Sequence, residues 1–253
     1  MIRLEQVTKQ FGGNRVLDKV DLEVLDGETL VIVGPSGVGK SVTLKLMVRL
    51  LTPDEGRVIV DDEIISVLEG RSLEIVREKF GMLFQGGALL QWLTVGENVA
   101  LPLREKTKLS EEDIVARVRE KLELVGLQDD YYKWPADLSG GMRKRAGLAR
   151  AVVENPRIIL YDEPTSGLDP VSSRLIDDLI NDLRRQTNVT SVVVTHDLHS
   201  ALAIGDRIVM INDGAIVETA SPARFIESKN ASVQQFLAAQ YITRRGEWEE
   251  GSS

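Results

Sequence analysis

The chain of 253 residues is long enough for one large domain or two small ones, and its 43% hydrophobic residues include no apolar run near the ~18 residues of a membrane span. The N-terminus, MIRLEQVTKQF, has polar and charged residues in place of the apolar segment of a secretion signal, so we expect a cytoplasmic protein. Cysteine is absent and the only histidines are His196 and His199, so any metal must use oxygen ligands, while a formal net charge of -8 disfavours broad binding to nucleic acid.

Short runs rich in β-branched residues alternate with helical patterns, which predicts an α/β core. The clearest helical pattern covers residues 170–186, where Asp169 can cap the helix and Pro170 suits its first turn. Its apolar residues share one face and are expected in the core: Leu175, Ile176, Leu179, Ile180 and Leu183. The runs that predict buried parallel strands are residues 29–33, 157–161, 191–194 and 207–211.

A helical subdomain inserted into this core is expected at about residues 90–156. Ser110 can begin a helix there, and Gly126 can end it. The apolar residues of that helix repeat at helical spacing: Ile114, Val118, Leu122 and Val125. We predict a single domain over residues 1–240 that contains this subdomain, followed by a polar tail at 241–253 whose end, rich in Gly and Ser, is expected to be disordered.

The strongest local motif, GPSGVGKS, directly follows the apolar strand TLVIV and satisfies the pattern GxxxxGK[ST] of a phosphate-binding loop. Glycines let successive backbone N–H groups turn toward phosphate oxygens, and the N-terminus of the following helix favours negative charge. The alternative is a simple Gly-rich turn, which the strand before the motif disfavours. The predicted nucleotide-binding residues are Gly34, Pro35, Ser36, Gly37, Val38, Gly39, Lys40, Ser41 and Val42.

Two side chains of this loop have distinct predicted roles. Lys40 would reach the β- and γ-phosphates from a solvated cleft, so its removal should not unfold the protein, and the Ser41 hydroxyl would ligate Mg²⁺. Val42 can offer phosphate only its backbone N–H, where related loops often have a hydroxyl residue.

Two adjacent acids, Asp162 and Glu163, follow the apolar residues of a predicted strand. In the functional interpretation Asp162 orients Mg²⁺ and its water shell, and Glu163 polarises the attacking water as general base. The alternative is a turn at the end of the strand, since Pro164 follows.

Before this strand, LSGGM opens another predicted helix. A hydroxyl group and two glycines at a helix start can form a second anion site of phosphate size. The alternative is that the serine is only an N-cap beside flexible glycines. The residues concerned are Ser139, Gly140, Gly141 and Met142.

The order of these motifs resembles the ATP-binding cassette (ABC) ATPase family over roughly residues 1–225: phosphate loop, LSGGM, a strand ending in Asp-Glu, SGLD at 166–169, then Thr195-His196. The resemblance implies a P-loop NTPase core with an inserted helical subdomain and an N-terminal antiparallel β region. It implies that Phe11 stacks on adenine, that Gln85 links Mg²⁺ and the γ-phosphate to the subdomain, and that His196 is a switch histidine. The D-loop it implies consists of Ser166, Gly167, Leu168 and Asp169.

Each of these three residues has an ordinary alternative interpretation when it is considered by itself: Phe11 as a core residue, Gln85 as a solvated turn residue and His196 as a surface residue. The resemblance depends on the order of all the motifs along the chain. The family further implies a head-to-tail homodimer in which Ser139 to Gly141 of one subunit close on ATP held by Lys40 of the other.

Two segments resemble the ATPase subunit of Mla-type transporters, which move phospholipids between bacterial membranes with MCE-domain partners. They are LSGGMRKRAGLARA, with Met142 where most family members have Gln, and FQGGALLQWLTVGENVALPL. The alternatives are that Met142 is a neutral substitution and that residues 143–145 form a solvated helix face.

The implied function is an ATPase subunit, dependent on ATP and Mg²⁺, that drives a separate membrane permease from the cytoplasmic face of the inner membrane, with MCE-domain and small accessory subunits as further partners. The apolar stretch 88–103, with Trp92 and Leu93, is expected either to face the permease or to pack the subdomain. The competing functions are transport of another substrate, a soluble cassette ATPase acting on ribosomes or DNA, and a regulator that binds ATP without turnover. The net negative charge disfavours action on ribosomes or DNA. The presence of Glu163 and His196 disfavours a regulator without turnover.

Overall fold

The computed structural model describes residues 1–240 and divides into two compact units. Among the described residues, the first unit consists of Met1–Leu68 and residues 194–240, and the second of Glu69–Val193. The tail predicted at 241–253 lies outside the described residues. No helix within residues 1–240 is both long and apolar enough to span a membrane.

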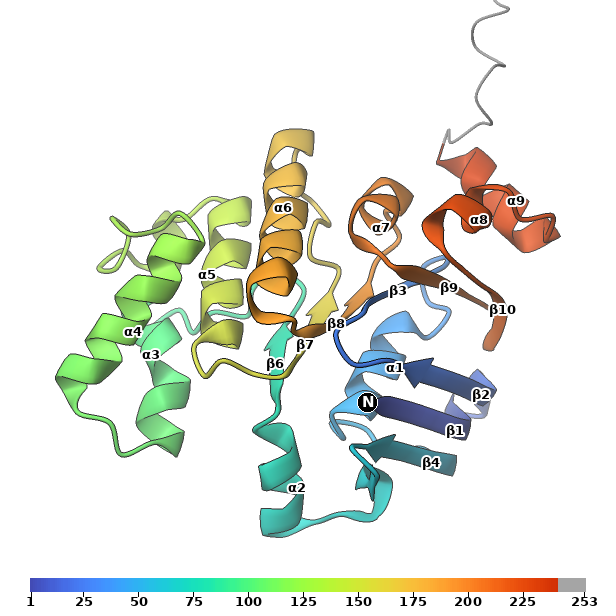
Figure 1. The fold of residues 1–253 in the computed structure, drawn as a ribbon, viewed down its shortest axis with the longest axis horizontal. Helices are drawn as coiled ribbons and strands as arrows, with labels where there is room; N and C mark the ends of the chain where they lie inside the picture. Colours follow the sequence, from blue (N-terminus) through green and yellow to red (C-terminus); the bar gives the residue numbers. More distant parts are fainter. Residues whose placement is uncertain (241–253) are drawn as a thin grey trace, which may run out of the picture. The chain divides into compact units, whose positions relative to one another are not determined.

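The first unit contains an antiparallel sheet with strand order β2-β1-β4-β5, and Figure 1 labels the first three of these strands. In this sheet Ile2 of β1 pairs with Val24 of β2 on one side and with Val60 of β4 on the other. This confirms the N-terminal antiparallel β region that the family resemblance implies. Its strands are β1 (Ile2–Phe11), β2 (Asn14–Val24), β4 (Glu55–Val60) and β5 (Glu63–Ile64).

A second group of strands in this unit carries the phosphate loop. Strand β3 (Thr29–Val33) is buried along its whole length and pairs in parallel with β9 (Arg207–Asn212), which pairs antiparallel with β10 (Ala215–Ala220). Continuous apolar runs such as TLVIV suit parallel strands that are covered on both faces. The helices of this unit are α1 (Lys40–Met47), η1 (Ile65–Val67), α7 (Leu198–Ile204), α8 (Pro222–Ile226) and α9 (Ala231–Ala239).

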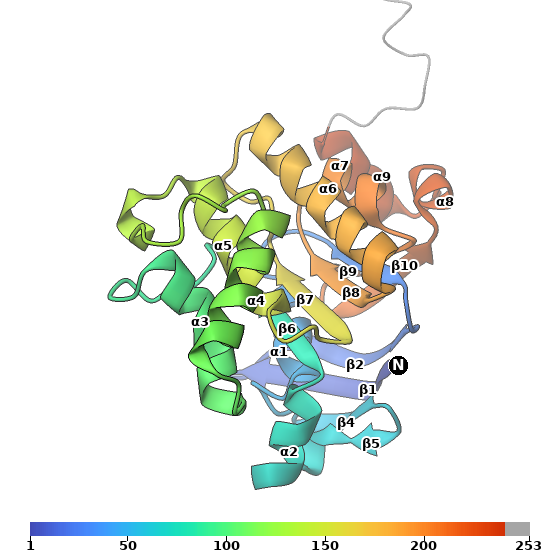
Figure 2. The same cartoon turned by 60° about the vertical axis from the view of Figure 1, so that its left-hand side comes forward.

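The second unit combines strands with a group of packed helices. Strand β6 (Phe80–Leu83) pairs in parallel with β7 (Ile158–Asp162), and β8 (Thr190–Val194) lies on the other side of β7. Figure 2 shows α3 (Val95–Lys106), α4 (Glu111–Leu124) and α5 (Gly140–Val152) close together. These helices lie within the predicted subdomain. The remaining elements are α2 (Gly70–Arg77), η2 (Pro135–Asp137) and α6 (Pro170–Thr187).

The helix boundaries follow from capping. The Ser110 side chain accepts a hydrogen bond from Asp113 N at the start of α4, and the Asp169 carboxylate accepts from Val171 N and Ser172 N at the start of α6. One core prediction was wrong: Leu175 is 44% exposed, while Ile176 is buried. Adjacent helix residues point about 100° apart, so Leu175 lies at the edge of the apolar stripe rather than within it.

Candidate functional site

The phosphate loop leads from β3 into α1, in the order that the sequence predicts, and its glycines are required by geometry. Gly34 has a φ of 150° and Gly39 a φ of 102°. A Cβ atom on Gly34 would lie 2.2 Å from the carbonyl oxygen of Ile211, and one on Gly39 would lie 2.9 Å from a methyl carbon of Val16. Substitution of either glycine would therefore strain the backbone and collide with its neighbours.

Lys40, the first residue of α1, is 6% exposed. Its ammonium group donates hydrogen bonds of 2.8 Å to both Gly34 O and Pro35 O. The expectation of a solvated lysine was therefore wrong: the side chain folds back along the loop, because a buried ammonium group needs acceptors and the loop carbonyls supply them. This position holds the positive charge inside the loop. Ser41 and Val42 follow, both half-buried.

The same unit holds the aromatic residue and the histidine that the resemblance singled out. Phe11 ends β1 with its ring 46% exposed, and Lys9 Nζ lies 5.4 Å from the ring centroid. His196 is exposed and follows Thr195, whose N–H donates to Ile32 O of β3 at 3.1 Å. An exposed ring is available for stacking, so the side chain of Phe11 fits its predicted role.

Gln240, just beyond α9, bonds to the backbone of the histidine itself and of the segment that follows it. Its Nε2 donates to His196 O at 2.9 Å, and its Oε1 accepts from Leu198 N at 3.2 Å. The sequence analysis missed this residue, since nothing in the local sequence links it to a segment 42 to 44 positions away.

In the second unit, Asp162 is the last residue of β7 and is 6% exposed, while Glu163 is half-buried. Glu163 has a φ of 51°, in the left-handed region that few non-glycine residues adopt. Such conformations are concentrated at functional sites, where surrounding contacts must hold them. The turn therefore aims the Glu163 side chain in a direction that an ordinary extended residue could not give.

The residues of LSGGM from Ser139 to Met142, the predicted family signature, lie at the start of α5. The Ser139 hydroxyl accepts from Met142 N at 3.2 Å as the helix cap, and Ser139 and Gly140 are both exposed. A Cβ atom on Gly141 would lie 3.4 Å from the side chain of Ser172 in α6. The helix start thus presents backbone N–H groups and a hydroxyl group to solvent beside the first turn of α6, which follows the predicted D-loop.

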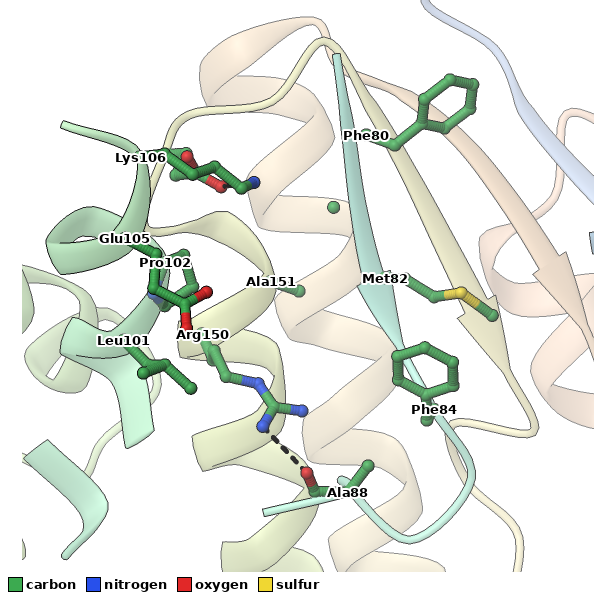
Figure 3. A pocket seen from close by; sticks show the side chains of 12 residues that line it. Phe80, Met82, Phe84, Ala88, Leu101, Pro102, Glu105, Lys106, Arg150 and Ala151 are labelled. Carbon is green, nitrogen blue, oxygen red and sulfur yellow. Dashed lines mark hydrogen bonds and ion pairs between the residues drawn. The ribbon is translucent and has the colours of Figure 1, made fainter. Parts of the chain in front are cut away.

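Gln85 lies just beyond β6 and is exposed. The loop that follows it packs closely on α5: a Cβ atom on Gly87 would lie 2.5 Å from Arg143 O. The Arg150 guanidinium donates to Gly87 O at 3.0 Å and to Ala88 O at 2.8 Å, the second of which is drawn in Figure 3. Burial lowers the pKa of Arg150, because desolvation disfavours its charged form. The loop is thereby fixed to the helix that carries the signature.

Lys144 is a functional candidate that sequence reasoning missed. The interpretation of residues 143–145 as a solvated face is wrong for it, since Lys144 is 4% exposed. Its ammonium group donates to Glu163 O at 2.9 Å and to Ser166 O at 2.6 Å. Burial lowers the pKa of Lys144 to about 8, although the Glu163 carboxylate acts to raise it. A lysine between two arginines in a helical pattern gives no sequence signal that it is buried.

Asn98 in α3 supports the loop between Gln85 and that helix. It is fully buried; its Oδ1 accepts from Leu90 N at 2.7 Å, and its Nδ2 lies within hydrogen-bond distance of the carbonyl oxygens of Leu90, Leu93 and Thr94. These contacts replace regular secondary structure over the loop.

We expect Asn98→Ala to lower the free energy of unfolding by about 2–4 kcal/mol, because it leaves several buried backbone groups without partners. Urea unfolding followed by circular dichroism measures this. Thr94→Ala is the comparison, since loss of that helix cap should cost only about 1 kcal/mol. Equal losses in the two variants would mean that the Asn98 contacts add nothing beyond an ordinary cap.

The residues assigned to Mg²⁺ supply suitable ligands. Ser41, Gln85 and Asp162 offer a hydroxyl, an amide and a carboxylate oxygen, the hard donors that Mg²⁺ prefers. Residues 1–240 contain no group of three or more His, Cys, Asp or Glu side chains that would hold a metal unaided.

Comparison with known proteins agrees with this geometry. The family model described as "ABC transporter" matches residues 17–166. The chain is 43% identical over 249 residues to the probable ribonucleotide transport ATP-binding protein mkl of Mycobacterium leprae, covering 98% of this chain and 72% of that protein. It is 40% identical to the intermembrane phospholipid transport system ATP-binding protein MlaF of Haemophilus influenzae, covering 94% of this chain and 90% of that protein.

A solved structure of the ATP-binding cassette MJ0796, described as a dimeric post-hydrolysis state bound to ADP and Pi, superimposes with a TM-score of 0.82. The two sequences are 36% identical, and the match covers 88% of this chain and 99% of that chain. The fold, the order of motifs and these relatives agree. The chain belongs to the ABC transporter family, as an ATP-binding subunit that hydrolyses ATP.

Proposed function

We propose that this chain is the ATPase subunit of a Mla-type transporter, and that it drives phospholipid movement between bacterial membranes through a separate permease. The observation that carries this is the similarity to MlaF, which extends over 90% of that protein. The Gly-Ala-Leu-Leu segment after Gln85 and the signature LSGGM support it. A second candidate cargo, ribonucleotides, is favoured by the similarity to mkl.

In this proposal each site residue acts on MgATP. The phosphate loop binds the phosphates through its backbone N–H groups, and Lys40 turns its ammonium group from the loop carbonyls toward the β- and γ-phosphates. When bound, Mg²⁺ neutralises charge that develops on the phosphate oxygens, with Ser41, Gln85 and Asp162 as its protein ligands or water-mediated partners. Glu163 orients and deprotonates the attacking water, and His196 contacts the γ-phosphate side.

We propose further that two copies share the nucleotides, the signature residues of one copy closing on ATP held by the other. The exposed start of α5 supports this, because an anion can approach Ser139 and Gly140 from solvent. The solved cassette at 36% identity, which is described as dimeric, also supports it. MCE-domain and small accessory subunits are partners in the same proposal, and the permease would hold the chain at the cytoplasmic face of the inner membrane.

A cavity of about 420 Å³ in the second unit is the proposed permease contact. In Figure 3, Leu101 and Pro102 of α3 face Met82 of β6 across it, with Arg150 of α5 and Ala88 between them. Within the predicted stretch 88–103, Val95, Val99 and Leu103 are buried, whereas Ala88, Leu101 and Pro102 line the cavity. Trp92 is 71% exposed and is not among the lining residues.

Leu101→Asp should abolish copurification with the permease and leave the ATPase rate of the isolated chain within about twofold of wild type, because it places a charge in an apolar contact away from the nucleotide residues. The control is Ile75→Asp on α2, which changes an apolar residue that is 48% exposed and lies outside the cavity. Retained copurification of the Leu101 variant would remove the cavity from the proposed interface.

Cargo is tested by reconstitution. The chain, a multi-span permease that copurifies with it and any MCE-domain protein are placed in liposomes, and ATP-dependent transfer of a fluorescent phospholipid to acceptor vesicles is measured. ATP-dependent uptake of labelled ribonucleotides without lipid transfer would support the second candidate. Glu163→Gln should show neither activity.

A further inference from the structure

We propose that Lys144 is a positioning residue for ATP hydrolysis: its ammonium group fixes the turn Glu163–Ser166 and joins it to the helix that carries the signature. This rests on the proposed role of Glu163 as general base. The contacts that support it all lie within the second unit.

Both acceptors of the Lys144 ammonium group belong to a single four-residue turn. Glu163 O and Ser166 O are the first and last carbonyl groups of that turn, at 2.9 and 2.6 Å from Nζ. The turn's own hydrogen bond, from Ser166 N to Glu163 O, is long at 3.3 Å. Lys144 therefore supplies the two shorter contacts, and it bridges the ends of the turn.

The conformation held in this way is unfavourable by itself. A residue that precedes proline prefers an extended backbone, yet Glu163, which precedes Pro164, has a φ of 51°. A non-glycine residue remains in that region only when surrounding contacts impose it. Lys144 is positioned to impose it, because it binds the carbonyl group of Glu163 itself.

The same lysine connects two parts of the site. Lys144 lies five residues after Ser139 on the same helix. Because a helix is rigid and rises about 1.5 Å per residue, the distance between Lys144 and the signature is fixed. At the start of α5, a Cβ atom on Gly140 would lie 3.6 Å from Leu168 Cδ2 in the predicted D-loop. A displacement of the signature helix would therefore be transmitted through one hydrogen bond to the carbonyl group of Glu163 and through the other to that of Ser166.

Lys144→Met removes the donors and keeps the shape of the side chain. We expect kcat for ATP hydrolysis to fall about tenfold or more, because the base loses its fixed position, whereas the Kd of MgATP stays within about twofold. Steady-state hydrolysis by the full chain and calorimetric titration with a non-hydrolysable ATP analogue measure the two constants.

The matched control is Arg145→Met, one residue further along α5. Arg145 also holds two backbone carbonyl groups, Val125 O at 2.6 Å and Gly126 O at 2.9 Å, but these lie at the end of α4, outside the catalytic turn. Arg145→Met should lower the melting temperature and leave kcat near wild type. Equal loss of kcat in both variants, or wild-type kcat in Lys144→Met, overturns the proposal.

Should Lys144→Met not fold, Lys144→Gln decides the matter. Its amide is shorter by one bond and uncharged, so we expect an intermediate fall in kcat, about three- to tenfold, with unchanged Kd. Wild-type kcat in Lys144→Gln overturns the role of the ammonium group. Failure of the general-base role is distinguishable, since it would appear as retained turnover in Glu163→Gln whatever the Lys144 variants do.

Discussion

Glu163→Gln is expected to stop ATP turnover and to leave nucleotide binding intact. The substitution keeps the size and hydrogen-bonding reach of the side chain and removes the negative charge that accepts a proton from the attacking water. General-base catalysis contributes roughly 10²- to 10⁴-fold, so the rate should fall by that factor. The measurement is phosphate release under saturating MgATP, with a parallel titration to show that Kd is preserved.

Stalled hydrolysis has a second expected consequence, which tests the shared site. ATP should accumulate between two subunits, so the variant should be dimeric with ATP and monomeric with ADP in size-exclusion chromatography with light scattering. Adding Ser139→Arg should prevent dimerisation, because a bulky cation at the exposed start of α5 would block closure. Wild-type turnover in Glu163→Gln would remove Glu163 from the base role. A stalled variant that stays monomeric with ATP would contradict closure by the isolated subunits.

The strands and helices around the site were predictable because their signals are local. The strand at 29–33 has both of its predicted bounds, since five buried apolar or β-branched residues stand between Glu28 and Gly34. Strand β6 was not predicted, because FGML is short and interrupted by glycine. The structure explains the glycine. A Cβ atom on Gly81 would lie 2.2 Å from Ala151 O, so α5 can pack this closely on the strand only if residue 81 has no side chain.

The contacts that position the site residues were not predictable, because each joins a side chain to backbone groups far away in the sequence. Lys144 reaches a turn 19 to 22 residues later, and Arg150 reaches a loop 62 to 63 residues earlier. Backbone carbonyl groups carry no residue identity, so no pattern of side chains marks them as partners. The phosphate loop, the Asp162-Glu163 pair and LSGGM were found as local motifs, and Phe11, Gln85 and His196 were assigned from the family resemblance. The contacts that support these residues can be seen only in the folded chain.

Helix α5 links these supports within the second unit. Its first residues form the predicted signature, Lys144 holds the turn that begins at Glu163, and Arg150 holds the loop after Gln85 while lining the proposed permease cavity. A rigid helix moves all of these contacts together, because its own backbone hydrogen bonds resist bending. In the proposed function, a displacement of α5 caused by the permease at the cavity would therefore also move the backbone at Glu163. No long series of separate side-chain movements would be needed.

Lys40→Ala is expected to weaken MgATP binding about 10- to 100-fold, since hydrogen bonds to a charged group contribute roughly 1.5–3 kcal/mol. The protein should remain folded, although Lys40 is 6% exposed. Its removal takes two donors from Gly34 O and Pro35 O, but it also removes the cost of burying an ammonium group, so the free energy of unfolding should change by only about 1 kcal/mol.

Calorimetric titration with ATP and thermal unfolding without nucleotide measure the two effects of Lys40→Ala separately. The control is Lys45→Ala, which removes the same charge from the last turn of α1 and leaves the loop intact. Because that cation lies beyond the helix start where phosphate binds, its loss should change ATP affinity by less than about threefold. If both variants lost the same ATP affinity, the effect would come from the change in net charge and not from the position of Lys40. Unchanged affinity in Lys40→Ala would mean that the backbone N–H groups of the loop bind the phosphates without the lysine.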